Sequence, residues 1–200
     1  MATKKISDLD PAVTPLTGSE LVELSQLSGG VYGSVQGTSS DLAFAGAKYG
    51  SFYDVTDQTG STSAATAVKF GTNDINTKGV TVATDGAALT RITYAAAGTY
   101  MFAPSLQLAN SDAADHDVTV WVAKNGTTVA ATATRITVPK AGDGGSAFFT
   151  TLFYFTLAAG DYLQVMWLPE NVAVTIDHVA AGAIAPAIPS AIAVTERIDL

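Results

Sequence analysis

Acidic residues and one of the two histidines gather in the stretch SDAADHDV, residues 111–118. Asp112, Asp115 and Asp117, together with His116, have the composition of a divalent-cation site. The spacing does not fit an EF-hand loop, which needs a glycine at its turn and a bidentate glutamate at its end. Because aspartate clusters are common in turns, we interpret the stretch as a solvated acidic loop, with a cation site as the alternative.

The other polar motifs do not form a recognisable catalytic pattern. Asp177 and His178 are neighbours in a predicted strand, so their side chains point to opposite faces and do not form an acid–base pair. GDGG, residues 142–145, has no helix or lysine after it and predicts a turn rather than a phosphate cradle. Serine-nucleophile, zinc-binding, Walker and dinucleotide-binding motifs are missing. We therefore expect no enzyme, no metal and no cofactor, although paired carboxylates distant in sequence leave a small β-type hydrolase as an alternative.

The composition limits the class of partner. Ten basic and eighteen acidic residues give a net charge of −8, and the largest basic cluster is the pair Lys4–Lys5, so phosphate backbones are repelled. No cysteine is present, which excludes disulfides. The start of the chain lacks the apolar core of a signal peptide, and the alanine-rich run 179–194 is broken by Pro186 and Pro189. We expect neither a nucleic-acid partner nor a membrane span.

The elements that must position any site are short strands. Two hundred residues suit one β-domain with a small appendage. From Gly50 onward, short alternating runs recur between turn signals and predict an all-β fold, an antiparallel jelly-roll sandwich of about ten strands over residues 50–200. Residues 1–45 predict an extension of short strands and turns, with a strand at ELVELSQ and a return strand after a glycine turn. This segment is too small for a core, so we expect it to dock on its own domain or on another protein.

One predicted hairpin carries a residue out of pattern. In DVTVWVAKNGTTVAAT, residues 117–132, three valines alternate with other residues, and Asn125–Gly126 suits a type I′ turn. Trp121 then points away from the valines, onto the face that the pattern marks as the outside. A neighbouring subunit or another partner would cover it there, and the alternative is that it lies under a loop of its own subunit.

Two further strands are apolar on both faces. FFTTLFYFTL, residues 148–157, has phenylalanine or leucine at both odd and even positions, and DYLQVMWL, residues 161–168, shows the same more weakly. Such a strand needs a cover on its outer side, which we expect to be another subunit, or alternatively the N-terminal segment. The candidate interface residues are Trp121, Phe148, Leu152, Tyr154, Met166 and Leu168.

Four motifs in residues 50–200 resemble one family. AAAGTYMFAPSLQL (95–108) resembles the G-x-Y-x-F strand of trimeric jelly rolls related to complement and tumour necrosis factor, and WVAKNGTTV resembles their strand with an N-G turn. FTLAAGDYLQVMWL (155–168) is similar to their L-x-x-G-D-x-L-x-V segment, and PAIPSAIAVTERI (186–198) is similar to the closing strand, in a form found in tailed-phage structural proteins. The resemblance implies a homotrimeric jelly roll.

The N-terminal stretch ATKKISDLDPAVTPLTGSELVELSQ resembles the openings of phage virion proteins, with Asp10 before the proline as a departure from their pattern. The resemblance implies a virion protein on the capsid surface: a homotrimeric decoration (cement) protein in which residues 1–45 anchor the trimer to the major capsid protein or another virion protein. The absence of a fibrous shaft favours this over the alternative, a tail-fibre or head-fibre module that recognises a host glycan or protein. The candidate anchor residues are Ile6, Leu9, Leu16, Leu21, Val22 and Leu24.

Overall fold

The computed structural model describes residues 21–28, 31–38, 47–73 and 77–199. The chain divides into two units, Met1–Gly46 and Ala47–Leu200. In the first unit, β1 (Leu21–Ser28) pairs in antiparallel register with β2 (Val31–Thr38), which confirms the predicted strand and its return. Three anchor candidates, Leu21, Val22 and Leu24, belong to β1, whereas Ile6, Leu9 and Leu16 lie outside the described residues.

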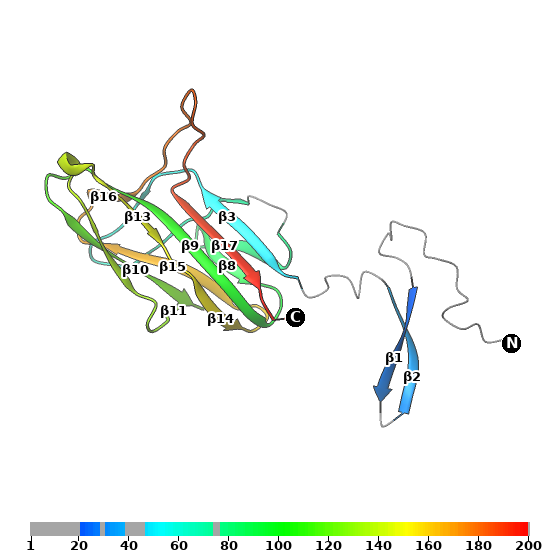
Figure 1. Cartoon of the computed structure of the whole chain (residues 1–200). Helices are drawn as coiled ribbons and strands as arrows, with labels where there is room; N and C mark the ends of the chain where they lie inside the picture. Colours follow the sequence, from blue (N-terminus) through cyan, green and yellow to red (C-terminus); the bar gives the residue numbers. More distant parts are fainter. Residues whose placement is uncertain (1–20, 29–30, 39–46, 74–76, 200) are drawn as a thin grey trace. The chain divides into compact units, whose positions relative to one another are not determined.

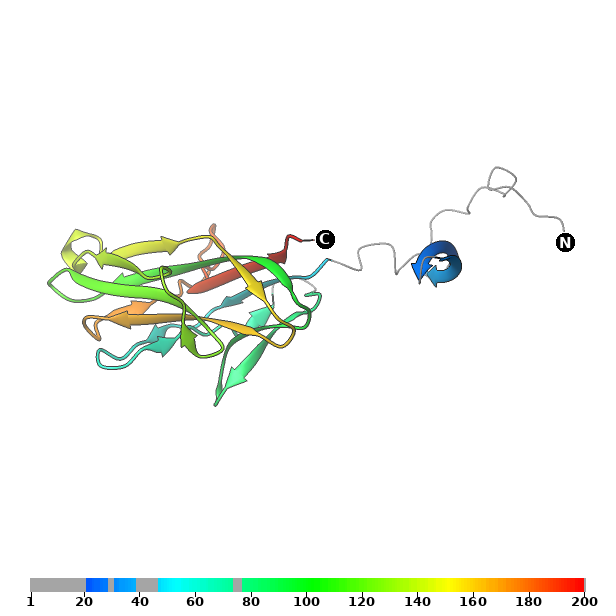
Figure 2. The same ribbon diagram turned by 90° about the horizontal axis from the view of Figure 1, so that it is seen from below.

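The second unit is an all-β sandwich of two antiparallel sheets (Figures 1 and 2). Its elements are β3 (Tyr49–Asp54), β4 (Gln58–Thr59), β5 (Thr66–Ala67), β6 (Thr72–Asn73), β7 (Val80–Asp85), β8 (Ala88–Tyr94), β9 (Gly98–Asn110), β10 (His116–Lys124), β11 (Thr127–Thr128), β12 (Thr134–Val138), the short 3-10 helix η2 (Ala141–Asp143), β13 (Ser146–Thr150), β14 (Phe153–Leu157), β15 (Tyr162–Pro169), β16 (Val174–Ile176) and β17 (Ala191–Arg197). Within the described ranges, no helix has the length and apolar character needed to cross a membrane.

The strand order is that of a jelly roll. In the β9 sheet, β13 and β14 pair with one side of β9, β17 and β16 with the other, and β3 lies beside β17. In the β10 sheet, β12 and β11 flank β10 on one side and β15 on the other, followed by β8 and β7. Early strands thus pair with late ones in nested order: β3 with β17, β8 with β15, β9 with β13 and β14, and β10 with β12. This nesting characterises jelly rolls, and the predicted fold class is confirmed.

Strict alternation builds the core between the sheets. Along β9, the even-numbered residues from Tyr100 to Asn110 are buried and the odd-numbered ones are partly exposed. Large aromatic side chains fill the interior, among them Trp167, Tyr94, Tyr100 and Phe102. Several polar groups that enter the core are paired: the hydroxyls of Tyr94 and Thr195 lie 3.1 Å apart, and the Asn110 side chain donates to the carbonyl of Val138 at 3.2 Å. The indole Nε1 of Trp167 is buried without a hydrogen-bond partner in the described part of the chain.

The predicted strand 148–157 is split into β13 and β14. Both pair with β9, and Thr150 opposite Ser105 and Phe153 opposite Phe102 keep the same register across the break. Thr151 donates its N–H to the carbonyl of Pro104 at 3.3 Å, but Pro104 has no N–H to return. The ladder is therefore interrupted opposite the proline, although the alternation of faces continues through it.

Other strand predictions differ from the structure at their ends. The return strand of the predicted hairpin is broken into β11 and β12 around Ala131, whose φ of 63° is left-handed. Thr132 folds back at this break and its hydroxyl accepts the N–H of Val122 at 3.1 Å. The strand predicted to contain Asp177 and His178 ends at Ile176, and both residues lie in the following segment.

Two of the motif turns hold each other in place. Asn125 (φ 52°) and Gly126 (φ 77°) form the two-residue turn after β10, as predicted, and Gly160 (φ 87°) turns the chain before β15. The Asn125 side chain donates to Asp161 at 2.7 Å and accepts the N–H of Tyr162 at 2.9 Å. Lys124 adds an ion pair with Asp161 at 2.8 Å. The N-G and G-D motifs, 35 residues apart in the chain, are therefore one structural unit.

This unit predicts a stability difference that depends on pH. The hydrogen bond with Lys124, followed by those with Asn125 and the N–H of Ala158, lowers the pKa of Asp161 to about 2. Since an unfolded aspartate has a pKa of about 3.9, ionised Asp161 stabilises the fold above that pH, and the contribution is lost as the pH falls through 2. We expect Asp161→Asn to be less stable than the wild type in urea unfolding at pH 6, and the difference to close towards pH 2.

The matched control is Asp143→Asn, which removes an exposed carboxylate whose nearest cation, Lys140, lies 3.5 Å away. It should change the free energy of unfolding little across this range. An Asp161→Asn variant as stable as the wild type at pH 6 would contradict the assignment.

Candidate functional site

The outer side of the β9 sheet carries a cluster of exposed and half-buried apolar side chains interspersed with uncharged polar ones, which we call the apolar face. It consists of seven side chains on β3, β9, β13, β14, β17 and the break between β13 and β14: Tyr53, Met101, Phe148, Leu152, Tyr154, Ile192 and Val194. Tyr154, Phe148 and Leu152 are 61%, 56% and 49% exposed. Contiguous exposed apolar surface of this kind marks a site of interaction in soluble proteins.

Cross-strand register assembles the apolar face from distant segments. Tyr154 lies opposite Met101, which lies opposite Glu196 on the other side. Two rows further along the sheet, one row crosses four strands and consists of Thr150, Ser105, Ile192 and Tyr53. Paired residues share a face of the sheet, so residues from positions 53 to 194 of the chain form one surface.

Charge is nearly absent from this surface. Among the outward-facing positions of β3, β9, β13, β14 and β17, Glu196 is the charged residue. The acidic residues of the described sandwich lie mainly in its turns, such as Asp112 and Asp115 before β10 and Asp143 in η2. The apolar face is therefore both exposed and free of the repulsion that the rest of the acidic chain would exert on another acidic protein.

The strand pair β13–β14 is apolar on both sides because it has two different roles. Phe149 and Leu157 are buried, and Phe153 and Phe155 are partly buried against the core. The ring of Phe155 lies 6.4 Å from that of Phe102. The alternate residues Phe148 and Tyr154 face outward. The inner side thus completes the core of its own sandwich, and the outer side belongs to the apolar face.

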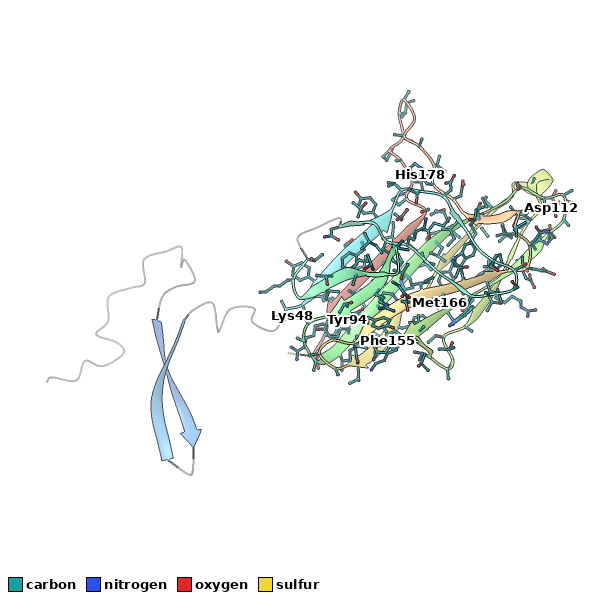
Figure 3. All side chains as sticks on the ribbon, turned by 180° about the vertical axis from the view of Figure 1, so that it is seen from behind. Lys48, Tyr94, Asp112, Phe155, Met166 and His178 are labelled. Carbon is teal, nitrogen blue, oxygen red and sulfur yellow. The ribbon has the colours of Figure 1, made fainter. Side chains whose placement is uncertain are left out.

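The remaining predicted interface residues lie on the opposite side of the molecule. Trp121, Met166 and Leu168 occupy the outer face of the β10 sheet, where Trp121 pairs directly with Met166; Met166 is labelled in Figure 3. Trp121 faces away from buried Val118, Val120 and Val122, as its position in the alternation predicted. The structure therefore divides the six candidates into two groups of three on two outer faces.

Trp121 lies in a shallow depression that its own chain frames. The depression has a volume of about 410 Å³ and is lined by Ala65, Ala67, Asp85, Trp121, Ala123, Gly126, Thr128, Gln164 and Met166. The indole Nε1 of Trp121 is buried and has no hydrogen-bond acceptor in the described part of the chain. The half-buried ring is thus partly covered by β5 and by the turn after β10, while one side of the depression stays open.

The candidate chemical groups do not converge. In the acidic loop, Asp112 contacts His116 at 2.7 Å, Asp115 accepts the N–H of Lys140, and Asp117 accepts the hydroxyl of Thr137. The hydrogen bond from His116, and then that from the N–H of Ala113, lowers the pKa of Asp112. Each carboxylate thus has its own partner, and no group of three potential metal ligands occurs among the described residues.

The second histidine lies at another part of the sandwich. Figure 3 shows His178 near the base of the loop that projects from the sandwich, away from Asp112. The backbone N–H of His178 donates to Asp57 at 2.8 Å. Burial, and then the neighbouring carboxylate of Asp57, raises the pKa of Asp177. The two carboxylates therefore form a local pair.

The sequence missed part of the apolar face. Tyr53, Met101, Ile192 and Val194 were not predicted as interface residues because each occurs in an ordinary alternating strand. Their signal was the low charge at alternate positions of β3, β9 and β17, where Glu196 is the one charged residue. These positions form a surface only when the strands pair.

Comparison with known proteins gives a similarity in fold. Three crystal structures of murine APRIL, at pH 8.5, 8.0 and 5.0, are 12%, 13% and 11% identical in sequence, with TM-scores of 0.47, 0.46 and 0.45. Each alignment covers 76% of this chain and 99% of the APRIL chain. No family model matches the sequence, and no curated protein matches it.

The position of Trp121 predicts its accessibility to a quencher. Trp167 is fully buried, so Trp121 should account for most of the fluorescence that acrylamide quenches. We expect Trp121→Phe to lower the quenching constant of the protein several-fold. Equal quenching of wild type and variant would mean that another subunit or the N-terminal segment covers Trp121 in solution.

Proposed function

We propose that this protein is a structural component of a phage virion: a homotrimer that decorates the capsid, binds the major capsid protein and stabilises the shell. The observation that carries the proposal is the apolar face. It provides a surface for self-association, and the sequence resemblance to virion proteins supplies the location.

The charge distribution favours another copy of this chain as the occupant of the apolar face. Two chains of net charge −8 repel one another at a distance. They can approach closely only through a surface with few charges. Among the outward-facing positions of β9, β13, β14 and β17, Glu196 is the one charged residue. Phe148, Leu152 and Tyr154 are 49–61% exposed, so burial there would contribute about half of the roughly 1.5–3 kcal/mol that a fully exposed apolar side chain gains, before the cost of association.

The shape of the apolar face favours a closed ring of copies. The surface extends across β3, β17 and β9 to the edge of the sheet at β13 and β14, which pair with β9 on one side and with no further described strand. The edge of one copy can therefore rest on the sheet of the next. Such head-to-tail contacts close into a ring when the rotation allows it, and the resemblance to trimeric jelly rolls gives three as the number of copies.

Attachment to the capsid is assigned to residues 1–45. The support is the resemblance of this stretch to the openings of virion proteins, together with its separation from the sandwich as a unit of its own. Three such segments on one trimer would bind neighbouring capsid subunits at once, which raises the effective concentration of each contact. The added contact area would hold the subunits together against the pressure of packaged DNA.

Substitution within the apolar face tests the self-association. We expect the full-length wild type to sediment as a trimer and the double variant Phe148→Asp, Tyr154→Asp to sediment as a monomer, because buried carboxylates without partners oppose the contact. Both side chains are exposed in the single chain, so the far-ultraviolet circular dichroism should not change. Val172→Asp is the matched control, since Val172 is 66% exposed and lies outside the apolar face. A wild-type monomer would overturn the proposal.

Removal of the N-terminal unit tests the anchor. We expect a chain that starts at Ala47 to form trimers but not to bind capsids stripped of this protein, whereas the full-length chain should bind them. Cosedimentation with stripped capsids measures both. Binding of the sandwich to host cells, with no binding of either chain to capsids, would instead favour the alternative of a fibre module that recognises the host surface.

A further inference from the structure

A loop between β16 and β17 projects from the sandwich as an apolar finger, defined here as residues 179–188 (Figure 1, between the strands labelled β16 and β17). The backbones of Val179 and Ile188 exchange two hydrogen bonds, of 3.1 and 2.8 Å, and Gly182 donates to Ala185 at 3.0 Å. The finger is therefore a hairpin with a defined turn. Pro186 restricts its backbone further, so little conformational entropy remains to be lost on binding.

The tip of the finger has no partner within its own described chain. Ile184 is 101% exposed, Val179 is 48% exposed and Ile188 is 44% exposed. The sequence VAAGAIAPAI contains no charged or polar side chain. Isolated exposed apolar residues are ordinary in soluble proteins, but ten consecutive residues without a polar side chain, projecting from the surface, require a specific cover.

A complementary groove lies at the base of the same finger. It has a volume of about 390 Å³ and is lined by Tyr53, Val55, Pro186, Ala187, Pro189 and Ile192. No residue in this lining is charged. Since Ile184 is fully exposed, the finger does not fill the groove of its own chain. One molecule therefore presents both an apolar knob and an unfilled apolar groove.

The groove is continuous with the apolar face. Tyr53 and Ile192 belong to both, and they are directly paired across β3 and β17. A neighbour that packs on the apolar face therefore reaches the groove as well. The tip of the finger and the groove at its base are different surfaces of one chain, so insertion of the tip of one copy into the groove of another is a head-to-tail contact, which is the type that closes into a ring.

We propose that the apolar finger of each copy inserts Ile184 into the groove of the next copy, so that three fingers lock the ring at one end of the trimer. This inference rests on the proposed homotrimer and specifies a contact within it. The occupant of the groove is a second copy of this chain, because the groove adjoins the surface that a second copy would cover and is free of charge like that surface.

Sedimentation equilibrium of the full-length protein tests the contact by its strength. We expect Ile184→Asp to raise the concentration at which trimers dissociate by at least about tenfold, because a carboxylate would replace the apolar knob in an apolar groove. The exposed position of Ile184 makes unfolding of the variant unexpected. Val172→Asp, the same kind of change at an exposed site outside both surfaces, should leave the dissociation unchanged.

Disulfide trapping tests the contact by its position, and the absence of cysteine from the chain makes it unambiguous. Two differently tagged full-length chains, Ile184→Cys and Val55→Cys, are coexpressed and oxidised. We expect a covalent product that carries both tags, since a disulfide forms only when the two Cα atoms come within about 7 Å. Coexpression of Ile184→Cys with Val172→Cys should give no such product.

The outcomes separate this inference from the trimer itself. If Ile184→Asp trimers are as stable as the wild type and no doubly tagged product forms, the finger contact is wrong and the trimer stands. If Ile184→Asp forms normal trimers but no longer binds stripped capsids, the finger contacts the capsid and the inference is likewise wrong. If the wild type itself is monomeric, the proposed function fails first.

Discussion

Strand β9 imposes the constraint on which the rest of the structure depends. It pairs with β13, β14, β16 and β17, and its alternation assigns the side chains of the whole sheet to an inner or an outer side. The inner side is filled by the core. The outer side carries the alternate residues of each strand, and in a chain with only 14% charged residues those positions are almost all uncharged. A surface that attracts a partner is thus a consequence of composition and register together.

Much of the fold was predictable because it depends on local patterns. The alternating runs gave most of the strands, Asn125–Gly126 gave the hairpin, and the turn at Gly160–Asp161 lies where the motif predicted. The errors arose where a side-chain or backbone contact overrides the alternation. Pro104, on the neighbouring strand, interrupts the pairing of β13 and β14, and Thr132 breaks the return strand by hydrogen bonding to the N–H of Val122. The pairing of Thr151 with Pro104 cannot be identified from residues 148–157, and alternation alone does not indicate the bond of Thr132.

The candidate site was predictable only in part. The alternation of the strands predicted that the apolar residues Trp121, Phe148 and Tyr154 face outward, and the structure places them outward. The assignment of these residues to different sheets depends on the order in which strands pair, which alternation does not contain. The apolar finger could not be predicted from the sequence either. Its alanine-rich run has no hydrophobic periodicity, so it is recognised as a hairpin only from its backbone hydrogen bonds.

The break opposite Pro104 has a consequence for how far assembly can proceed. An exposed edge strand is a template on which strands of other molecules can add indefinitely, and proteins commonly protect such edges by interrupting them. Here the edge consists of β13 and β14, two five-residue strands separated by Thr151 and Leu152, so a foreign strand would meet two short strands in place of one long one. The missing N–H of one proline therefore disfavours growth into open fibrils while leaving the side chains of the same edge available for side-by-side contact.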